Sequence, residues 1–272
     1  MTEPPVLPEG AALAPGYAAL GLLARGLDLD VYDAWSEERD CRCVVKVLRP
    51  DRAPDADARE RLLGEGRLLL GLAHPHLVRA YEVVEQPPAV VLETLSGATL
   101  ATMVTERRRR LPVTDLCHLG LQLCSAIGYL HRRDILHLDL KPSNVISELG
   151  HLKLIDLSLA RPRGPGPAGL GTRQYLAPEQ ARGGQATAAS DVFGLGGVLF
   201  AAATAARPFP RVDGPFEQLE RRAAPVGSLR RLPAAFAGAI DGCLNPESAA
   251  RPTITALRDV LEEVLGAQPG DS

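Results

Sequence analysis

Short apolar runs separated by glycines and charged clusters dominate the first third of the chain. Between Leu20 and Leu48 such runs flank the charged cluster 36–40 and predict a small antiparallel sheet, in which residues 43–48 form the clearest strand. A helical period follows over residues 58–72, and two more strands are predicted over 77–84 and 89–93. This part of the chain is therefore expected to be mostly β, with one main helix.

Longer helical patterns take over after residue 111. A helix is predicted to begin near Thr114 as its N-cap, with leucines and an isoleucine repeating on one face. Two short strands are expected over 144–146 and 152–155, with a hairpin turn at 148–150, and everything beyond Gln180 has helical character. A mostly β half followed by a mostly α half is typical of the α+β class, in which a ligand cleft is expected between the halves.

The same patterns set the expected organisation of the chain. Residues 1–16 contain four prolines and few anchoring hydrophobic residues, so we predict a flexible arm. The β half is placed at 17–95, the helical half at 96–265 and a tail at 266–272. The apolar stretch from Val192 to Ala206 is shorter than the roughly 18–20 residues that span a bilayer, so it is interpreted as a buried helix.

Composition narrows the possible partners and compartment. The formal net charge is −3 over 272 residues, which gives no general basic field for nucleic acid or an anionic membrane. Five scattered cysteines and a start without a basic and apolar leader favour a reducing cytoplasm. A metal site at Cys41 and Cys43 is not expected, because no second Cys/His pair has ligand spacing. The arginine run 107–110 predicts a solvated face or a contact to an acidic partner, and the sequence sets no oligomeric state.

A group of polar residues in the second half suits phosphoryl transfer. Asp139 and Asn144 flank a tight proline-containing turn, and Asp156 ends an apolar strand that is expected to run alongside. Carboxylate and amide oxygens are ligands for a hard cation, and a nearby ammonium binds phosphate, so Lys141 completes a candidate metal and phosphate site. Lysine is rare in this arginine-rich chain, which favours a specific need for a compact ammonium at Lys46 and Lys141.

These motifs, in this order, resemble the eukaryotic-type Ser/Thr protein kinase family as found in bacteria, over residues 17–265. The resemblance implies a bilobal fold with a small antiparallel β lobe and a larger helical lobe. It implies that Asp139 orients the substrate hydroxyl, that Asn144 and Asp156 bind Mg²⁺ or Mn²⁺, and that Lys46, paired with Glu65, binds the phosphates of ATP. The implied reaction is transfer of the γ-phosphate to protein Ser or Thr.

The resemblance also implies ATP contacts in the loop after the first long strand and in the link between the halves, namely from Ala24, Gly26, Val31, Glu93 and Leu95. The three glycines of the family's loop fall here on Ala24, Gly26 and Leu29, so only one is glycine. Side chains at the other two positions hold the backbone away from phosphates, and Asp28 adds a negative charge. We therefore expect weak or loose nucleotide binding.

Further motifs resemble the peptide-binding part of the family. Gly171-Thr172 and Ala177-Pro-Glu179 resemble the end of an activation segment, which places Thr172 near Asp139 and Lys141 and favours Ser/Thr acceptors. By the same resemblance, residues 190–196 begin a buried central helix and Arg251 is the buried partner of Glu179. These last two features are expected to be structural.

Two departures from the family pattern concern regulation. Leu138 stands where many members have the arginine that receives a phosphorylated activation segment, and Ser158 is the only hydroxyl between Leu157 and Gly171. A chain that lacks both the receiver and the usual phosphosites is expected not to be switched by phosphorylation of this segment.

Two other functions stay open at the level of sequence. The eroded loop and Ser158, in place of the usual glycine after Asp156, would also suit a pseudokinase scaffold. The Asp139 and Asn144 pattern is shared with small-molecule kinases of the antibiotic-phosphorylating sort, although Thr172, Glu179 and Arg251 favour a protein substrate.

Overall fold

The computed structural model describes residues 4–106, 108–211 and 213–267 and divides into two compact units, Met1–Ser96 and Gly97–Ser272. The first unit is mostly β and the second mostly α, so the expected α+β class is confirmed. The boundary lies one residue from the predicted one. Each unit has its own hydrophobic core and is described separately.

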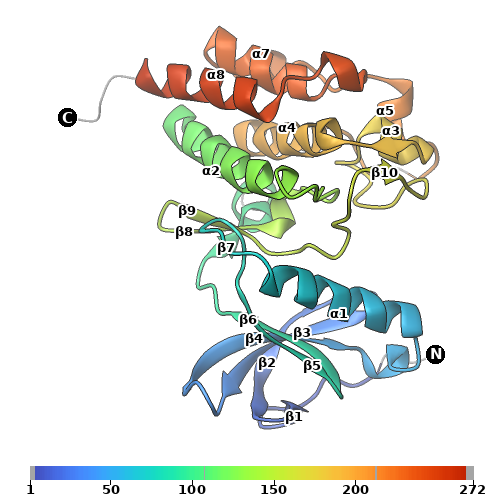
Figure 1. Cartoon of the computed structure of the whole chain (residues 1–272). Helices are drawn as coiled ribbons and strands as arrows, with labels where there is room; N and C mark the ends of the chain where they lie inside the picture. The colour runs from blue at the N-terminus through green and yellow to red at the C-terminus, as the bar shows by residue number, and fades with distance from the viewer. Residues whose placement is uncertain (1–3, 107, 212, 268–272) are drawn as a thin grey trace. The chain divides into compact units, whose positions relative to one another are not determined.

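A six-stranded antiparallel sheet in the order β1-β2-β3-β4-β6-β5 builds the first unit (Figure 1). The strands are β1 Ala12–Ala14, β2 Tyr17–Arg25, β3 Leu29–Ser36, β4 Cys41–Leu48, β5 Ala80–Glu85 and β6 Pro88–Glu93. A short 3-10 turn, η1 (Pro50–Arg52), leads into the helix α1 (Ala56–Leu70). Asp55 caps α1 by accepting a hydrogen bond of 2.9 Å from the backbone nitrogen of Ala58.

Helix α1 lies on one face of the sheet, beside β5 and β6 (Figure 1). Gly66 explains how closely it packs, since a Cβ at this position would lie 2.6 Å from the side chains of Val83 and Val90. Because side chains alternate along a strand, Val91 points to the other face, where it joins the core cluster. A glycine that weakens the helix in isolation therefore permits its contact with the sheet.

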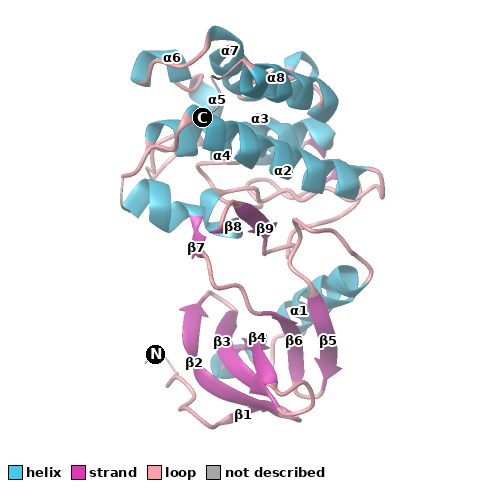
Figure 2. Ribbon diagram, turned by 90° about the vertical axis from the view of Figure 1, so that its left-hand side faces the viewer, coloured by secondary structure: helices cyan, strands magenta, loops and turns pink. Residues whose placement is uncertain are grey.

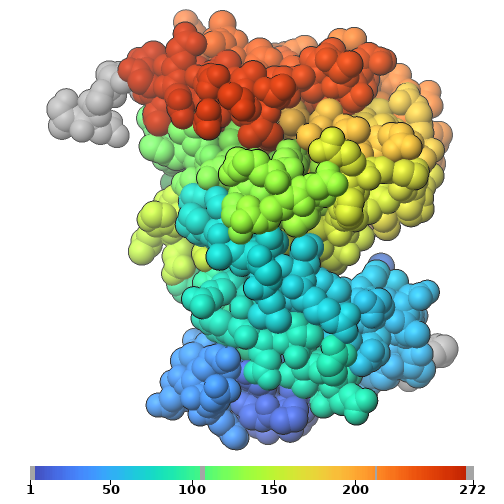
Figure 3. Space-filling view, in the orientation of Figure 1, coloured from blue at the N-terminus to red at the C-terminus, as the bar shows by residue number. Residues whose placement is uncertain are grey.

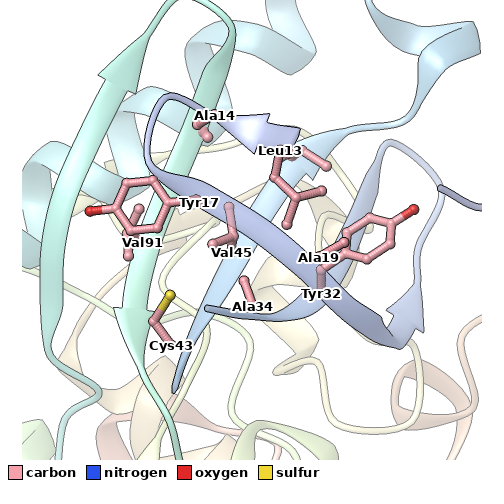
Figure 4. Packing of buried hydrophobic residues seen from close by; sticks show 11 residues of the cluster. Leu13, Ala14, Tyr17, Ala19, Tyr32, Ala34, Cys43, Val45 and Val91 are labelled. Atoms are coloured by element: carbon pink, nitrogen blue, oxygen red, sulfur yellow. The ribbon is translucent and has the colours of Figure 1, made fainter. Parts of the chain in front are cut away.

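The core on that other face includes a strand that the sequence did not predict (Figure 4). Leu13 and Ala14 of β1 are each 4% exposed and pack in one cluster with Tyr17, Tyr32 and Val45. The prediction of a flexible arm over 1–16 was wrong for residues 12–14. Gly16, with a φ of +77°, makes the turn that folds β1 back onto β2, and a three-residue strand is too short to show an alternating pattern.

The second unit is a helical assembly with two small sheets (Figure 2). Its α-helices are α2 Val113–His131, α3 Pro178–Arg182, α4 Ala188–Thr204, α5 Glu217–Glu220, α6 Val226–Leu229, α7 Ala234–Cys243 and α8 Ile254–Gly266. Its strands are β7 Ala98–Thr99, β8 Val145–Glu148 and β9 His151–Leu154 in one sheet, and β10 Gly164–Pro165 with β11 Gln185–Ala186 in the other. Short turns complete it: the π-helix η2 Thr102–Glu106 and the 3-10 turns η3 Pro142–Asn144 and η4 Ser248–Ala250.

Helix α4 forms the centre of this unit, since every residue from Ser190 to Thr204 is buried. Helix α4 packs against α2 and α7. Helix α8 packs on α2, and both α8 and α2 are visible at the surface in Figure 3. Helix α2 begins at Val113 with Pro112 in the N-cap position, so the predicted cap at Thr114 was wrong. In the described ranges no helix combines the length and the apolarity needed to cross a bilayer.

Candidate active site

The loop that carries Asp139 is held by the buried start of α4. Thr187 caps α4, and Asp191 in its first turn is 1% exposed. Its carboxylate accepts hydrogen bonds from the backbone nitrogens of His137 at 2.9 Å and Leu138 at 2.8 Å. A third partner is Nε2 of His131, at 2.7 Å. These contacts fix the loop at Leu138, whose φ of +64° is unfavourable for a branched side chain.

Asp139, Lys141 and Thr172 form a closed set of contacts. Nζ of Lys141 lies 2.6 Å from Oδ2 of Asp139 and donates to Oγ1 of Thr172 at 2.7 Å. The backbone nitrogen of Thr172 donates to Oδ1 of Asp139 at 2.9 Å. The ammonium, the carboxylate and the hydroxyl are thus linked in one set around Asp139, which is only 8% exposed.

Asn144 is joined to the same loop through its amide. Its Nδ2 donates to the backbone oxygen of Asp139 at 3.0 Å and to Oδ2 of Asp139 at 3.3 Å. The backbone oxygen of Asn144 accepts from the nitrogen of Ile155 at 3.1 Å, which brings the end of β9 beside this turn. Asp156 follows directly, and its Oδ1 accepts from the backbone nitrogen of Ser158 at 3.0 Å.

The donor atoms of Asn144 and Asp156 fit a hard divalent cation. Both side-chain hydrogen bonds of Asn144 use its Nδ2, so the side-chain oxygen Oδ1 is the atom left for a ligand. Over the described part of the chain no three His, Cys, Asp or Glu side chains are grouped to enclose a metal by themselves. Mg²⁺ keeps several waters and binds through one or two protein ligands plus substrate phosphates, which agrees with a pair of oxygen donors.

In the first unit, Lys46 on β4 and Glu65 on α1 form a buried ion pair. Nζ of Lys46 lies 2.8 Å from Oε1 of Glu65, and the two side chains are 11% and 0% exposed. The packing of α1 on the sheet sets this contact. The ion pair expected from the family resemblance is therefore present.

The predicted nucleotide loop is short and is anchored by arginines. Ala24 pairs with Val31 across β2 and β3, and the nitrogen of Gly26 donates to the oxygen of Leu29 at 2.8 Å. The carboxylate of Asp28 forms ion pairs with Arg52 at 2.9 Å and Arg61 at 2.8 Å. The negative charge expected to face phosphate is therefore neutralised in part by residues of its own unit.

The two predicted contacts in the link after β6 differ in what surrounds them. Glu93 ends β6, and its carboxylate accepts a hydrogen bond of 2.9 Å from the backbone nitrogen of Arg79. Leu95 follows the strand and is half-buried. Their contacts with ATP stay predictions.

A buried ion pair supports the segment that follows Thr172. Arg251 donates to both carboxylate oxygens of Glu179, at 2.7 and 2.8 Å, and Ser190 donates to the same carboxylate at 2.8 Å. Burial by itself would raise the pKa of Glu179, but the hydrogen bonds and charge of Arg251 outweigh it and hold that pKa below its ordinary value. The partner predicted for Glu179 is therefore in place.

Comparison with known proteins agrees with this geometry. The model of the protein kinase domain family matches residues 17–261. The chain belongs to the protein kinase domain family. A probable serine/threonine-protein kinase of Streptomyces coelicolor, SCO3848, is 33% identical over 215 residues, which are 74% of this chain and 32% of that protein. The serine/threonine-protein kinase PrkC of Bacillus subtilis is 33% identical over 208 residues, with the same two coverages.

This kinase domain spans about a third of the length of those curated relatives. Among solved structures, a mutant form of the kinase domain of Mycobacterium tuberculosis PknI matches with a TM-score of 0.75. The match covers 95% of this chain and 98% of that one at 22% sequence identity, so it supports the bilobal kinase fold alone. Members of the family use ATP and a divalent metal.

Leu138 of the kinase domain is buried in a small apolar cluster. It is 5% exposed and packs with Leu136 and Ala186, the last of which belongs to β11. Strand β11 pairs with β10 inside the segment that follows Asp156, and Leu136 exchanges two backbone hydrogen bonds with Arg161 of that segment. At Leu138, where many members of the family have an arginine, this chain thus has an apolar contact, and the neighbouring Leu136 forms backbone hydrogen bonds to the segment.

Two glutamines and Asp191 support the site in ways the sequence did not predict. Nε2 of Gln180 donates to the backbone oxygen of Leu138 at 2.9 Å. Nε2 of Gln218 donates to the backbone oxygens of Arg173 and Leu176, both at 3.0 Å. Asp191 was predicted only as part of a helix start. The Thr187 cap signals where that helix begins, but no sequence signal indicates which loop a buried side chain will reach.

Proposed function

We propose that this chain is a serine/threonine protein kinase that transfers the γ-phosphate of MgATP to Ser and Thr hydroxyls of protein substrates, with Mn²⁺ as the alternative metal. The observation that carries the proposal is the closed contact of Asp139, Lys141 and Thr172. A hydroxyl that takes the place of the Thr172 contact would meet a carboxylate and an ammonium together. That is the pairing which in-line phosphoryl transfer requires from the protein.

Each side chain then has one task. Asp139 accepts a hydrogen bond from the acceptor hydroxyl and orients it, and Lys141 balances charge on the transferred phosphate. Asn144 and Asp156 hold the divalent cation, which when bound neutralises the phosphates. Lys46, oriented by Glu65, would bind phosphate oxygens of ATP. Ala24, Gly26, Val31, Glu93 and Leu95 would supply the remaining nucleotide contacts.

Neither alternative function is favoured by this arrangement. A scaffold without catalysis has no need for a buried ion pair between Lys46 and Glu65, whose desolvation is costly. A small-molecule kinase has no need for a segment built on Thr172 and supported by Glu179 and Arg251.

The test is labelling by radioactive ATP with Mg²⁺, on the chain itself and on a mixture of Ser- and Thr-containing peptides. We expect labelling by the natural sequence and none by Asp139→Asn. The control Asp134→Asn makes the same chemical change at an exposed ion pair with Arg163. A natural protein that binds MgATP but labels no better than Asp139→Asn would refute the proposal, and turnover restricted to small molecules would replace it.

We also propose that phosphorylation of the activation segment does not gate this activity. Leu138 offers no positive charge to a phosphate, and the segment is already held through Leu136, Arg161 and the β10–β11 pair. Phosphatase treatment is expected to leave the initial rate unchanged. Loss of activity on treatment, with recovery after incubation with MgATP, would contradict this part of the proposal.

A further inference from the structure

A hollow of about 320 Å³ opens beside the catalytic contacts in the second unit. Lys141 and Thr172 form part of its lining, so whatever occupies it lies next to the acceptor site. Its neutral polar lining comes from Ser143, Gln174 and Tyr175. Its second cation is Arg207, and no described Asp or Glu lines it.

Arg207 is exposed and has no hydrogen bond or ion pair with any residue in the described ranges. Tyr175 does not neutralise it, because burial raises the pKa of this phenol to about 12 even with Arg207 nearby. At the wall of the hollow Arg207 therefore faces a neutral phenol and no described carboxylate. Arg207 has no ion pair or hydrogen bond to break in the described part of the chain, so an incoming anion does not compete with a partner of the fold.

Arg207 does not serve to satisfy the backbone carbonyls at the C-terminal end of α4. Two other arginines take the last carbonyls of that helix: Arg110 donates to the oxygen of Thr204 at 3.3 Å, and Arg230 donates to the oxygen of Ala203 at 3.0 Å. With the helix end satisfied by these arginines, Arg207 is available to a ligand.

The backbone at Arg207 is fixed from both sides. Ala205, with a φ of +58°, turns the chain away from α4, and its nitrogen donates to the oxygen of Ala201 at 2.8 Å. On the other side Phe209 is 2% exposed and stacks on Phe193, with ring centroids 6.0 Å apart. The charge is thus presented from a rigid support, which lowers the entropic cost of binding.

We infer that this hollow is a substrate subsite that selects an anionic side chain, a carboxylate or a phosphorylated residue, a short distance along the peptide from the acceptor Ser or Thr. The inference rests on the proposed kinase function. An extended peptide advances about 3.3–3.6 Å per residue, so a side chain within a few residues of the acceptor reaches the hollow. Arg207 attracts the anion, and a substrate arginine or lysine at this place meets the like charge of Arg207.

A set of matched peptides tests the subsite. Each carries one acceptor, and each neighbouring position in turn is Ala, Glu, phosphoserine or Arg. At one position we expect the initial rate with Glu to exceed that with Arg by about 1.4- to fivefold, the range for exposed charge pairs. The phosphoserine peptides show whether a phosphate or a carboxylate is preferred, and either preference supports an anionic subsite.

The variants Arg207→Ala and Arg207→Glu locate the effect. Arg207→Ala is expected to bring the ratio of the rates with Glu and Arg peptides to about one, and Arg207→Glu is expected to reverse it. Both rates are measured with the same variant, so a change in folding or in overall activity cancels in the ratio. Arg211→Glu is the matched control, because it makes the same change on an exposed arginine of the same loop outside the hollow. An unchanged ratio in Arg207→Glu, or a preference for Arg in the natural sequence, would overturn the inference.

Binding of the same peptides, labelled with a fluorophore, separates this inference from the proposed function. Peptides that bind in an Arg207-dependent way but are never phosphorylated would uphold the subsite and refute the kinase activity. Phosphorylation that is indifferent to charge at every position would do the reverse. No binding and no phosphorylation would overturn both.

Discussion

Replacing Asp191 by asparagine tests how the catalytic loop is held. The natural carboxylate receives three hydrogen bonds of 2.7–2.9 Å, from His131, His137 and Leu138, and is fully buried. Asparagine has the same shape but only one acceptor oxygen. Its amide group would present a donor to a backbone N–H that is itself a donor.

The cost follows from the bonds that are lost. A buried donor left unsatisfied costs about 1–3 kcal/mol, and a hydrogen bond to a charged acceptor contributes about 1.5–3 kcal/mol. We therefore expect Asp191→Asn to lower the free energy of unfolding by about 3–5 kcal/mol. For a domain of this size that is a fall in Tm of about 6–20 °C. If Asp139 moves by about 1 Å as the loop relaxes, kcat falls by about a hundredfold.

Calorimetry and steady-state kinetics on the folded variant measure the two effects. The control Asp134→Asn removes one carboxylate oxygen at an exposed site with a φ of +58°, which asparagine tolerates, and is expected to change stability by less than about 0.5 kcal/mol. If Asp191→Asn matched this control in both Tm and kcat, the hydrogen bonds to His137 and Leu138 would not be what holds the loop.

Three further predictions address other parts of the second unit. Thr172→Ser should keep kcat, because serine retains the hydroxyl that accepts a hydrogen bond from Lys141. Thr172→Val loses that hydroxyl and should lower kcat by about ten- to a hundredfold. Equal rates in the two variants would contradict this prediction. Glu179→Gln should destabilise the protein by about 3–5 kcal/mol at pH 7. The pKa of Glu179 is lowered in the folded protein, so its contribution to stability is complete above the ordinary pKa of 4.5 and is lost as the pH falls below that value. The free energies of unfolding of the natural protein and of Glu179→Gln, measured with denaturant, should therefore converge in acid. A difference between them that does not change with pH would refute the assignment. Burial raises the pKa of Cys117 to about 11 and that of Cys124 to about 12, so neither thiol should react with iodoacetamide at pH 8 until the protein unfolds, as peptide mass spectrometry can show.

Much of the fold could be predicted because the decisive patterns are local. The apolar run that predicted a strand at 43–48 lies inside β4, and the apolar run that begins at Val192 lies mostly inside α4. The motifs around Asp139, Asn144 and Asp156 have fixed short spacings, so the turns that carry them could be placed without the structure. Strand β1 was missed because its three residues gain their stability from pairing with β2 and not from a pattern of their own.

The sequence by itself determined the order of the two units, the family resemblance and the identity of the polar residues in the site, because these depend on residue type and short-range spacing. Only the tertiary structure decided which distant groups meet them. Asp191 reaches a loop more than fifty residues earlier in the chain, with partners at 53 and 54 residues. Leu138 packs with Ala186. Arg207 has no ion-pair partner in the described part of the protein, because no described Asp or Glu lines the hollow beside it. Such contacts arise from packing between elements far apart in sequence, and local periodicity does not encode them.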